Sequence, residues 1–148
     1  MRYFLKEKQL DEVYINAEND LFNSPLIKFK KCRFWRKDNV PNLAGIYALF
    51  NEKGELLYIG ESGNIRERMN EINRTVNHSF RKQFGHIEYG GIKSKKKFDD
   101  KVETLLDNYF DKNLHVSFLP INFGRLEIET YLISKYQEKL YNSIKKRK

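Results

Sequence analysis

The chain has 148 residues, a length that suits one domain with a single hydrophobic core. Its 28 lysine and arginine residues outnumber 20 aspartate and glutamate residues, and the net charge of +8 favours a polyanionic partner without identifying one. The single cysteine, Cys32, excludes an intrachain disulfide, and we expect it to be half-buried in a strand. The chain has neither the ~18 apolar residues of a membrane span nor the apolar core of a secretory signal, so we expect a cytoplasmic protein without a membrane partner.

The first 43 residues are expected to extend the fold, because no linker or repeat separates them from the rest of the chain. A mixed segment runs through Phe22, and the partial alternation of apolar and basic residues from Leu26 to Trp35 predicts an edge strand. We therefore expect an N-terminal extension over 1–43 packed on a core domain over 44–142, followed by a solvated basic tail over 143–148.

A β-hairpin is predicted next, because the β-prone runs Gly45–Phe50 and Glu55–Gly60 flank four residues that are typical of a turn. If those four residues form the loop, counting back along both strands places Tyr47 directly opposite Tyr58. The two phenols are then expected to share one face of the sheet.

Four helices and one further strand are predicted after the hairpin. The first helix covers Ser62–Arg74, with Asn64 and Glu67 spaced as in a capping box. The others follow from hydrophobic periodicity bounded by glycine or proline: helices over Ser79–Phe84, Phe98–Phe110 and between Gly124 and Asn142, and a strand over Leu114–Leu119. We expect an α+β fold with a small, mainly antiparallel three-stranded sheet and flanking helices.

Six residues of the hairpin carry a family resemblance. Gly45, Ile46 and Tyr47, then ten residues, then Tyr58, Ile59 and Gly60 resemble the signature of the GIY-YIG nucleases. Such a match arises at one starting point by chance with odds on the order of one in ten million. Three later residues are also similar to the family pattern: Arg68, Glu129 and Asn142. With them, the resemblance covers about two thirds of the chain.

The resemblance implies a DNA endonuclease that uses Mg²⁺ or Mn²⁺. Tyr47 would accept a proton from the attacking water, and for this its phenol must be deprotonated or hydrogen-bonded to a general base. Tyr58 would orient that water. Arg68 offers a planar fork that bridges two phosphate oxygens. Glu129 would be the metal ligand, since Mg²⁺ keeps most of its coordination sphere as water and phosphate oxygen.

The last helix separates Glu129 from the neighbouring acid Glu127. At 100° per residue, the apolar side chains of this helix average to a direction about 15° from Glu129 and nearly opposite Glu127. An inward-facing carboxylate is costly unless it is paired or binds a cation. Glu129 is therefore the carboxylate that we expect in the site.

One position departs from the family pattern. Many members carry histidine or tyrosine four residues after the arginine, where this chain has Ile72. His78 is the candidate replacement in the catalytic site, although a lone histidine also serves a structural role.

Further substrate-binding candidates are basic residues that would contact DNA phosphates, which set the register without reading sequence. Asn142 and the basic tail are also expected to bind the substrate, and for the charged residues the alternative is a solvated face. The basic candidates within the domain are Arg74, Arg81, Lys82, Lys95, Lys96 and Lys97.

Two functions stay open at this point. The first is a metal-dependent endonuclease, and the alternative is a catalytically inactive DNA-binding module that retains the fold. A restriction-like or phage-like use is favoured, because a chain of this size leaves no room for the added recognition domain of homing enzymes. A homodimer or higher oligomer is possible, since a double-strand cut by a single-site nuclease needs two subunits or two binding events.

Overall fold

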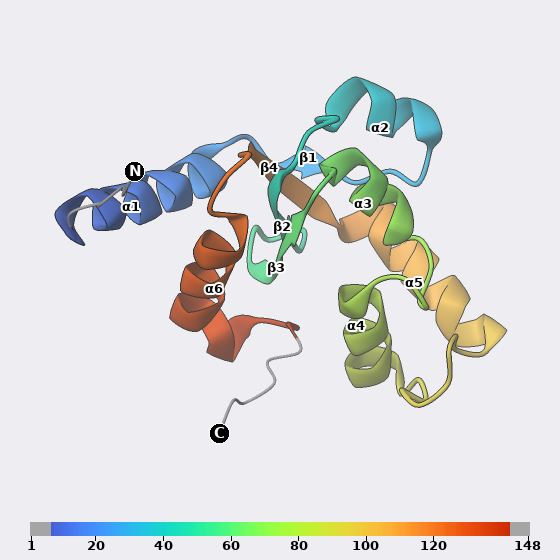
Figure 1. Cartoon of the computed structure of the whole chain (residues 1–148). Coiled ribbons are helices and arrows are strands. Elements are labelled where there is room, and N and C mark those ends of the chain that lie inside the picture. The colour runs from blue at the N-terminus through green and yellow to red at the C-terminus, as the bar shows by residue number, and fades with distance from the viewer. Residues whose placement is uncertain (1–6, 143–148) are drawn as a thin grey trace.

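The computed structural model describes residues 7–142 and is built on a four-stranded antiparallel sheet in the order β1-β4-β2-β3 (Figure 1). The strands are β1 (Ile27–Lys28), β2 (Gly45–Phe50), β3 (Leu56–Ser62) and β4 (His115–Pro120). The α+β class is confirmed, but the sheet has four strands rather than three, because β1 from the N-terminal extension pairs with β4. The basic tail over 143–148 lies outside the described residues.

Helices cover both faces of the sheet (Figure 1). One layer holds α1 (Glu7–Asn23) and α6 (Arg125–Tyr136), and the other holds α3 (Ile65–Glu71), α4 (Ser79–Tyr89) and α5 (Asp100–Asn113). All six residues of the central strand β2 are buried, because alternate side chains enter two separate cores. None of the helices that the structure describes is long and apolar enough to cross a lipid bilayer.

The N-terminal extension differs most from the prediction. The mixed segment forms α1, whose residues Ala17 and Leu21 are buried against the sheet. The predicted edge strand shortens to β1, and the chain then forms α2 (Arg33–Asn39) beside α3. Within α2, Trp35 packs edge-on against Phe29, with ring centroids 5.2 Å apart. Cys32 is exposed at the N-terminus of α2, so its predicted place in a strand is wrong.

The hairpin is confirmed, but its predicted register is wrong. Tyr47 lies opposite Gly60, and Tyr58 lies opposite Leu49. Phe50 faces Leu56 rather than Glu55, and an irregularity between Leu49 and Phe50 shifts the pairing by one more residue from Leu49 onward. The two tyrosines are therefore diagonal neighbours on one face, with ring centroids 6.1 Å apart.

The predicted helix boundaries hold at their caps and shift by a few residues elsewhere. The side chain of Asn64 accepts a hydrogen bond from Glu67 N, as a cap at this position requires, although α3 ends at Glu71 rather than Arg74. The left-handed backbone of Gly90, with φ of 70°, terminates α4. Strand β4 and helix α5 form within three residues of their predicted bounds, α4 runs five residues beyond Phe84, and α6 ends at Tyr136, before Asn142, followed by a 3₁₀ turn over Gln137–Lys139.

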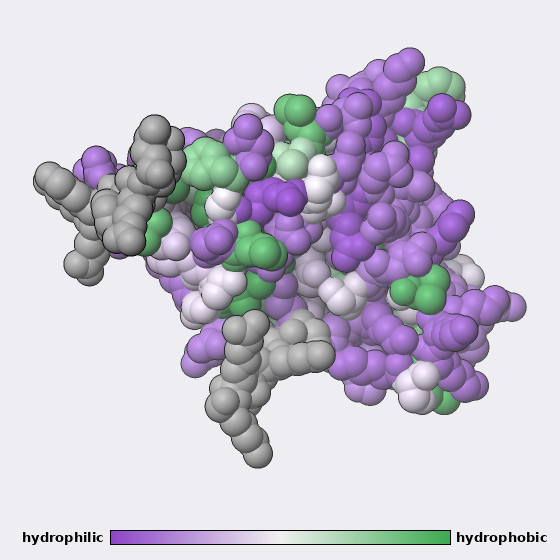
Figure 2. All heavy atoms as spheres, in the orientation of Figure 1, coloured by the Kyte–Doolittle hydropathy of each residue, from purple (hydrophilic) through white to green (hydrophobic). Residues whose placement is uncertain are grey.

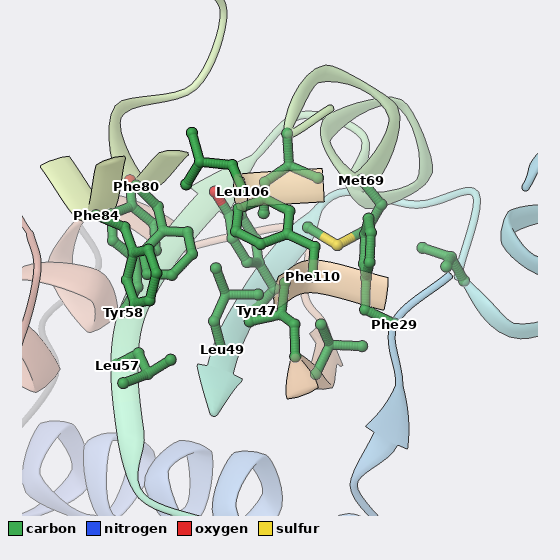
Figure 3. Close-up of a cluster of buried hydrophobic side chains, with 14 of the residues drawn as sticks. Phe29, Tyr47, Leu49, Leu57, Tyr58, Met69, Phe80, Phe84, Leu106 and Phe110 are labelled. Carbon is green, nitrogen blue, oxygen red and sulfur yellow. The ribbon is translucent and has the colours of Figure 1, made fainter. Parts of the chain in front are cut away.

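An ion-pair cluster joins α4 to α5 inside the larger core, whose aromatic residues appear in Figure 3. Arg81 is 1% exposed, and its Nη2 lies 2.7 Å from Glu103 and 2.9 Å from Asp107. Its guanidinium also sits over the ring of Phe110.

The carboxyl of Glu103 is held in its charged form by this cluster. Burial raises the pKa of Glu103, but hydrogen bonds from Thr75, Arg81 and Phe98 N outweigh it and leave that pKa below the ordinary value. Arg81 therefore fixes α4, the helix that begins directly after His78.

We predict that Arg81→Gln lowers the free energy of unfolding by about 3 kcal/mol, because it leaves carboxylates without their buried counter-charge. Lys30→Gln removes only the 3.5 Å pair with Asp111 on the surface and should cost less than about 1 kcal/mol. Urea unfolding of both variants measures the difference, and equal midpoints would contradict the structural role of Arg81.

Candidate active site

The ring of Tyr47 lies across the backbone of Gly60. Tyr47 belongs to the central strand β2 and is opposite Gly60 in β3, the edge strand of the sheet. A methyl group added at Gly60 would lie 2.3 Å from both the ζ carbon and the hydroxyl oxygen of Tyr47, far inside van der Waals contact. Glycine at this position therefore lets the phenol reach over the edge strand.

The outer edge of β3 is closed by Asn142. Its amide accepts a hydrogen bond from Ile59 N at 3.1 Å and donates one to Ile59 O at 2.7 Å. Tyr141 N donates to Leu57 O at 2.8 Å, so the segment after α6 satisfies the strand much as another strand would. The amide of Asn142 is engaged by the sheet, and we assign it a structural role in place of the expected substrate contact.

His78 joins the site through a hydrogen bond to Tyr47. Its Nε2 lies 2.8 Å from the Tyr47 hydroxyl, and its Nδ1 accepts a hydrogen bond from Phe80 N at 3.1 Å. Burial, followed by the nearby charge of Arg68, holds the pKa of His78 well below its ordinary value, so the ring is neutral. Because Nδ1 is an acceptor, the single ring proton resides on Nε2, and His78 donates to the oxygen of Tyr47.

Tyr58 completes an aromatic group around the same point. Its ring centroid lies 5.4 Å from that of His78, and its hydroxyl is 2.8 Å from the hydroxyl of Ser79. Figure 3 shows Tyr47 and Tyr58 within the same cluster of buried side chains. Burial raises the pKa of Tyr58, and the hydrogen bond to Ser79 and the charge of Arg68 lower it only in part.

Arg68 supplies the positive charge of the site. Its Nη1 lies 2.5 Å from a Glu71 carboxylate oxygen and 3.0 Å from Asn77 O. Both of these bonds use Nη1, and the guanidinium also forms a hydrogen bond with Tyr47, so a phosphate would contact the N–H groups that remain. Burial and the charge of Tyr58 raise the pKa of Tyr47 well above its ordinary value, and Arg68 is the charge that lowers it.

Glu129 enters the site from α6, in the other layer. It is half-buried, whereas Glu127 is exposed, so the inward direction predicted for Glu129 is confirmed. Burial, followed by the charge of Glu61, raises the pKa of Glu129 to about 7. Within the described part of the chain, no ion pair involves Glu129, while Glu61 lies 3.7 Å from Arg125. A bound cation would therefore stabilise the ionised form of this carboxylate.

Two members of this group were not predicted from the sequence. Ser79 binds Tyr58, and Glu61 acts on Glu129 across the edge of the sheet. Glu61 directly follows Gly60, and alternation along the strand would have placed it on the face opposite Tyr58. The contact with Ser79 had no sequence signal, because it depends on how α4 packs.

The expected DNA-contacting residues fall into three groups. Arg74 and the run Lys95, Lys96 and Lys97 are exposed, and Lys82 is half-buried. Arg81 is buried in its ion-pair cluster, which does not fit a phosphate contact. Lys145 to Lys148 lie outside the described residues.

The five expected catalytic residues are brought together at the edge of β3. The rings of Tyr47, Tyr58 and His78 are in mutual contact, with centroids 5.4 to 6.1 Å apart. The charge of Arg68 acts on all three rings, and the charge of Glu129 acts on Tyr58. Among the described residues, no cluster of three or more histidine, cysteine, aspartate or glutamate side chains has the spacing of a metal site.

Comparison with known proteins identifies the family of the chain. A family model described as the GIY-YIG catalytic domain matches residues 43–142. UvrABC system protein C of Neisseria meningitidis serogroup B is 36% identical over 81 residues, which are 51% of this chain and 12% of that protein. The same-named protein of Brucella suis biovar 1 is 38% identical over 42 residues, 28% of this chain and 7% of that protein.

The chain therefore covers only a small part of the length of these relatives. No solved structure gives a significant match. The family match extends over most of the chain and includes every residue of the site described above. The chain thus belongs to the GIY-YIG family and carries its catalytic domain.

Proposed function

We propose that the protein hydrolyses phosphodiester bonds in DNA with one divalent metal ion, Mg²⁺ or Mn²⁺. The observation that carries this proposal is the meeting of Tyr47, Arg68 and Glu129 at one edge of the sheet, from two different layers. These residues supply a base, a phosphate clamp and a hard oxygen ligand, which are the parts that such a hydrolysis requires.

Tyr47 is the general base in this proposal, and His78 supports it. The phenolate oxygen takes a proton from the water that attacks phosphorus. His78 donates its Nε2 proton to that oxygen and stabilises the phenolate, but it does not receive the phenol proton, since Phe80 N occupies Nδ1. Tyr58, held by Ser79, orients the attacking water.

Arg68 and Glu129 act on the substrate phosphate. The guanidinium of Arg68 bridges two non-bridging oxygens and stabilises the charge that develops at phosphorus as the leaving oxygen departs. The carboxylate of Glu129 fits a metal ion, because it forms no ion pair among the described residues and a second carboxylate, Glu61, lies beside it. When bound, the ion supplies Lewis acidity to the phosphate and to coordinated water.

We further propose a restriction-like or phage-like use, in which DNA contacts outside the catalytic domain come from the N-terminal extension. The matched relatives share 12% or less of their own length with this chain. Their likeness therefore supports a shared catalytic chemistry and does not bear on the biological use. DNA is the partner in either case, and a double-strand cut would require two copies or two binding events.

Glu129→Gln should lower the cleavage rate ~10²-fold or more while leaving DNA affinity and thermal stability largely intact, because the amide keeps the shape but not the charge. Glu127→Gln, on the exposed side of the same helix, is the matched control and should cut normally. Nicking of plasmid DNA in Mg²⁺, with and without chelator, provides the measurement. An active Glu129→Gln enzyme would refute the assignment, and an inactive wild type that still binds DNA would favour the inactive binding module.

His78→Asn separates the two roles of His78. Asparagine is a good N-terminal cap, so α4 should keep its first turn, but it cannot donate to Tyr47 from the position of Nε2. We predict a fall in kcat of up to ~10²-fold and a rate that rises toward higher pH than in the wild type, with a small change in melting temperature. Loss of stability without these kinetic changes would show His78 to be purely structural.

The pKa of Glu129, raised to about 7, predicts a pH-dependent metal requirement. Below pH 7 the carboxyl is mostly protonated, so the Mg²⁺ concentration for half-maximal cleavage should rise about fivefold between pH 7 and pH 6. The folded state without metal binds this proton more tightly than the unfolded state, so its stability should fall as pH rises from about 4.5 to about 7. Melting curves without metal should show this slope in the wild type and not in Glu129→Gln.

A further inference from the structure

A groove of about 510 Å³ lies between α2 and α3, outside the catalytic residues. Its lining has a single carboxylate, Glu67. Four of the lining residues are basic: Arg33, Arg36, Lys37 and Arg66. Figure 2 shows a predominantly hydrophilic surface over these two helices. Three of the four cations belong to α2, which precedes the family domain.

These four cations are not neutralised by protein carboxylates. Within residues 7–142 no ion pair involves any of them. Elsewhere in the same extension, Lys30 and Lys31 are paired with Asp111 and Asp107 on α5. The chain therefore concentrates unpaired positive charge in this groove, where like charges repel one another unless an anion joins them.

The walls of the groove are held in place by backbone contacts. Arg66 Nε donates to Val40 O at 2.9 Å and its Nη2 donates to Lys37 O at 3.3 Å, which ties α3 to the C-terminal end of α2. Ile65 N donates to Leu43 O at 2.8 Å, and this bond fixes the connection between the extension and the domain. The walls of the groove are thus joined by contacts within the protein.

The groove shares α3 with the active site. Arg66 and Arg68 are two residues apart, so at 100° per residue their side chains leave the helix on nearly opposite sides, roughly one helix diameter of ~10 Å apart. Phosphates follow one another every ~3.4 Å along the axis of each DNA strand. Three phosphate steps along one strand cover about the same distance, so the groove lies only a few phosphate spacings from the catalytic arginine.

We propose that the groove between α2 and α3 binds the phosphate backbone of duplex DNA beside the scissile bond, an inference that rests on the proposed nuclease function. Arg33 and Lys37 are exposed and contact consecutive phosphates, while Arg66 holds the wall of the groove. These contacts fix the register of the duplex without reading its sequence. The N-terminal extension thereby gives the catalytic domain a second DNA-binding surface.

The double variant Arg33→Gln/Lys37→Gln tests this proposal against a control with the same loss of charge, Lys30→Gln/Lys31→Gln. Both are made in the Glu129→Gln background so that a 20-base-pair duplex stays intact, and affinity is measured by fluorescence anisotropy over a range of salt concentrations. Each phosphate contact contributes about 0.9 to the slope of log affinity against log salt, so the groove variant should lose about 2 units of slope. The control should keep the slope of the parent, because its lysines already have counter-charges.

The outcomes separate the groove from the catalytic proposal. In the otherwise wild-type protein, the groove variant should raise KM and leave kcat at saturating DNA unchanged. The proposal that the groove binds DNA is overturned if the Glu129→Gln parent and both double variants have equal salt slopes, or if both double variants lose the same slope. Plasmid cleavage by the wild type does not depend on that result. A wild type that fails to cut DNA while the groove variant alone loses slope overturns the nuclease function and leaves the groove as a DNA-binding surface.

Discussion

The contact between the ring of Tyr47 and the backbone of Gly60 is the constraint on which the site depends. Any side chain at Gly60 would occupy the space of the phenol, and any side chain at Gly45 would collide with Leu119 O at 2.2 Å. The two glycines at the outer ends of the sequence motif are thus required by close packing in the same sheet. They allow a tyrosine from the central strand to place its hydroxyl over the edge strand, within hydrogen-bond distance of His78.

The edge of β3 is also where the two helical layers meet. The layer of α3 and α4 provides Arg68 and His78, and the layer of α6 provides Glu129. The N-terminal extension stabilises α6 from outside, since Glu18 of α1 accepts hydrogen bonds from Lys135 at 2.8 Å and from the Tyr136 hydroxyl at 3.0 Å. The position of the carboxylate therefore depends on packing between an element of the family domain and an element that precedes it.

Burial sets the charge state of the site. It raises the pKa of Tyr47, Tyr58 and Glu129 and lowers the pKa of His78, so each of these groups favours its neutral form in the free protein. Arg68 alone keeps its charge, because burial lowers its pKa less than the neighbouring phenols and Glu71 raise it. A cation at Glu129 would favour the ionised forms that the chemistry uses.

The sequence alone predicted the family, the hairpin and the candidate catalytic residues that the fold brings together, because glycines, a capped helix and hydrophobic periodicity are local signals. It also selected Glu129 over Glu127, since the direction of a side chain on a helix follows from its spacing. It could not give the register of Tyr47 and Tyr58, because one irregularity in pairing shifts every partner beyond it. Only the tertiary structure decided that Arg81 is buried among carboxylates while Arg33 and Lys37 face an open groove, since the environment of a charge is set by helices that are distant in sequence.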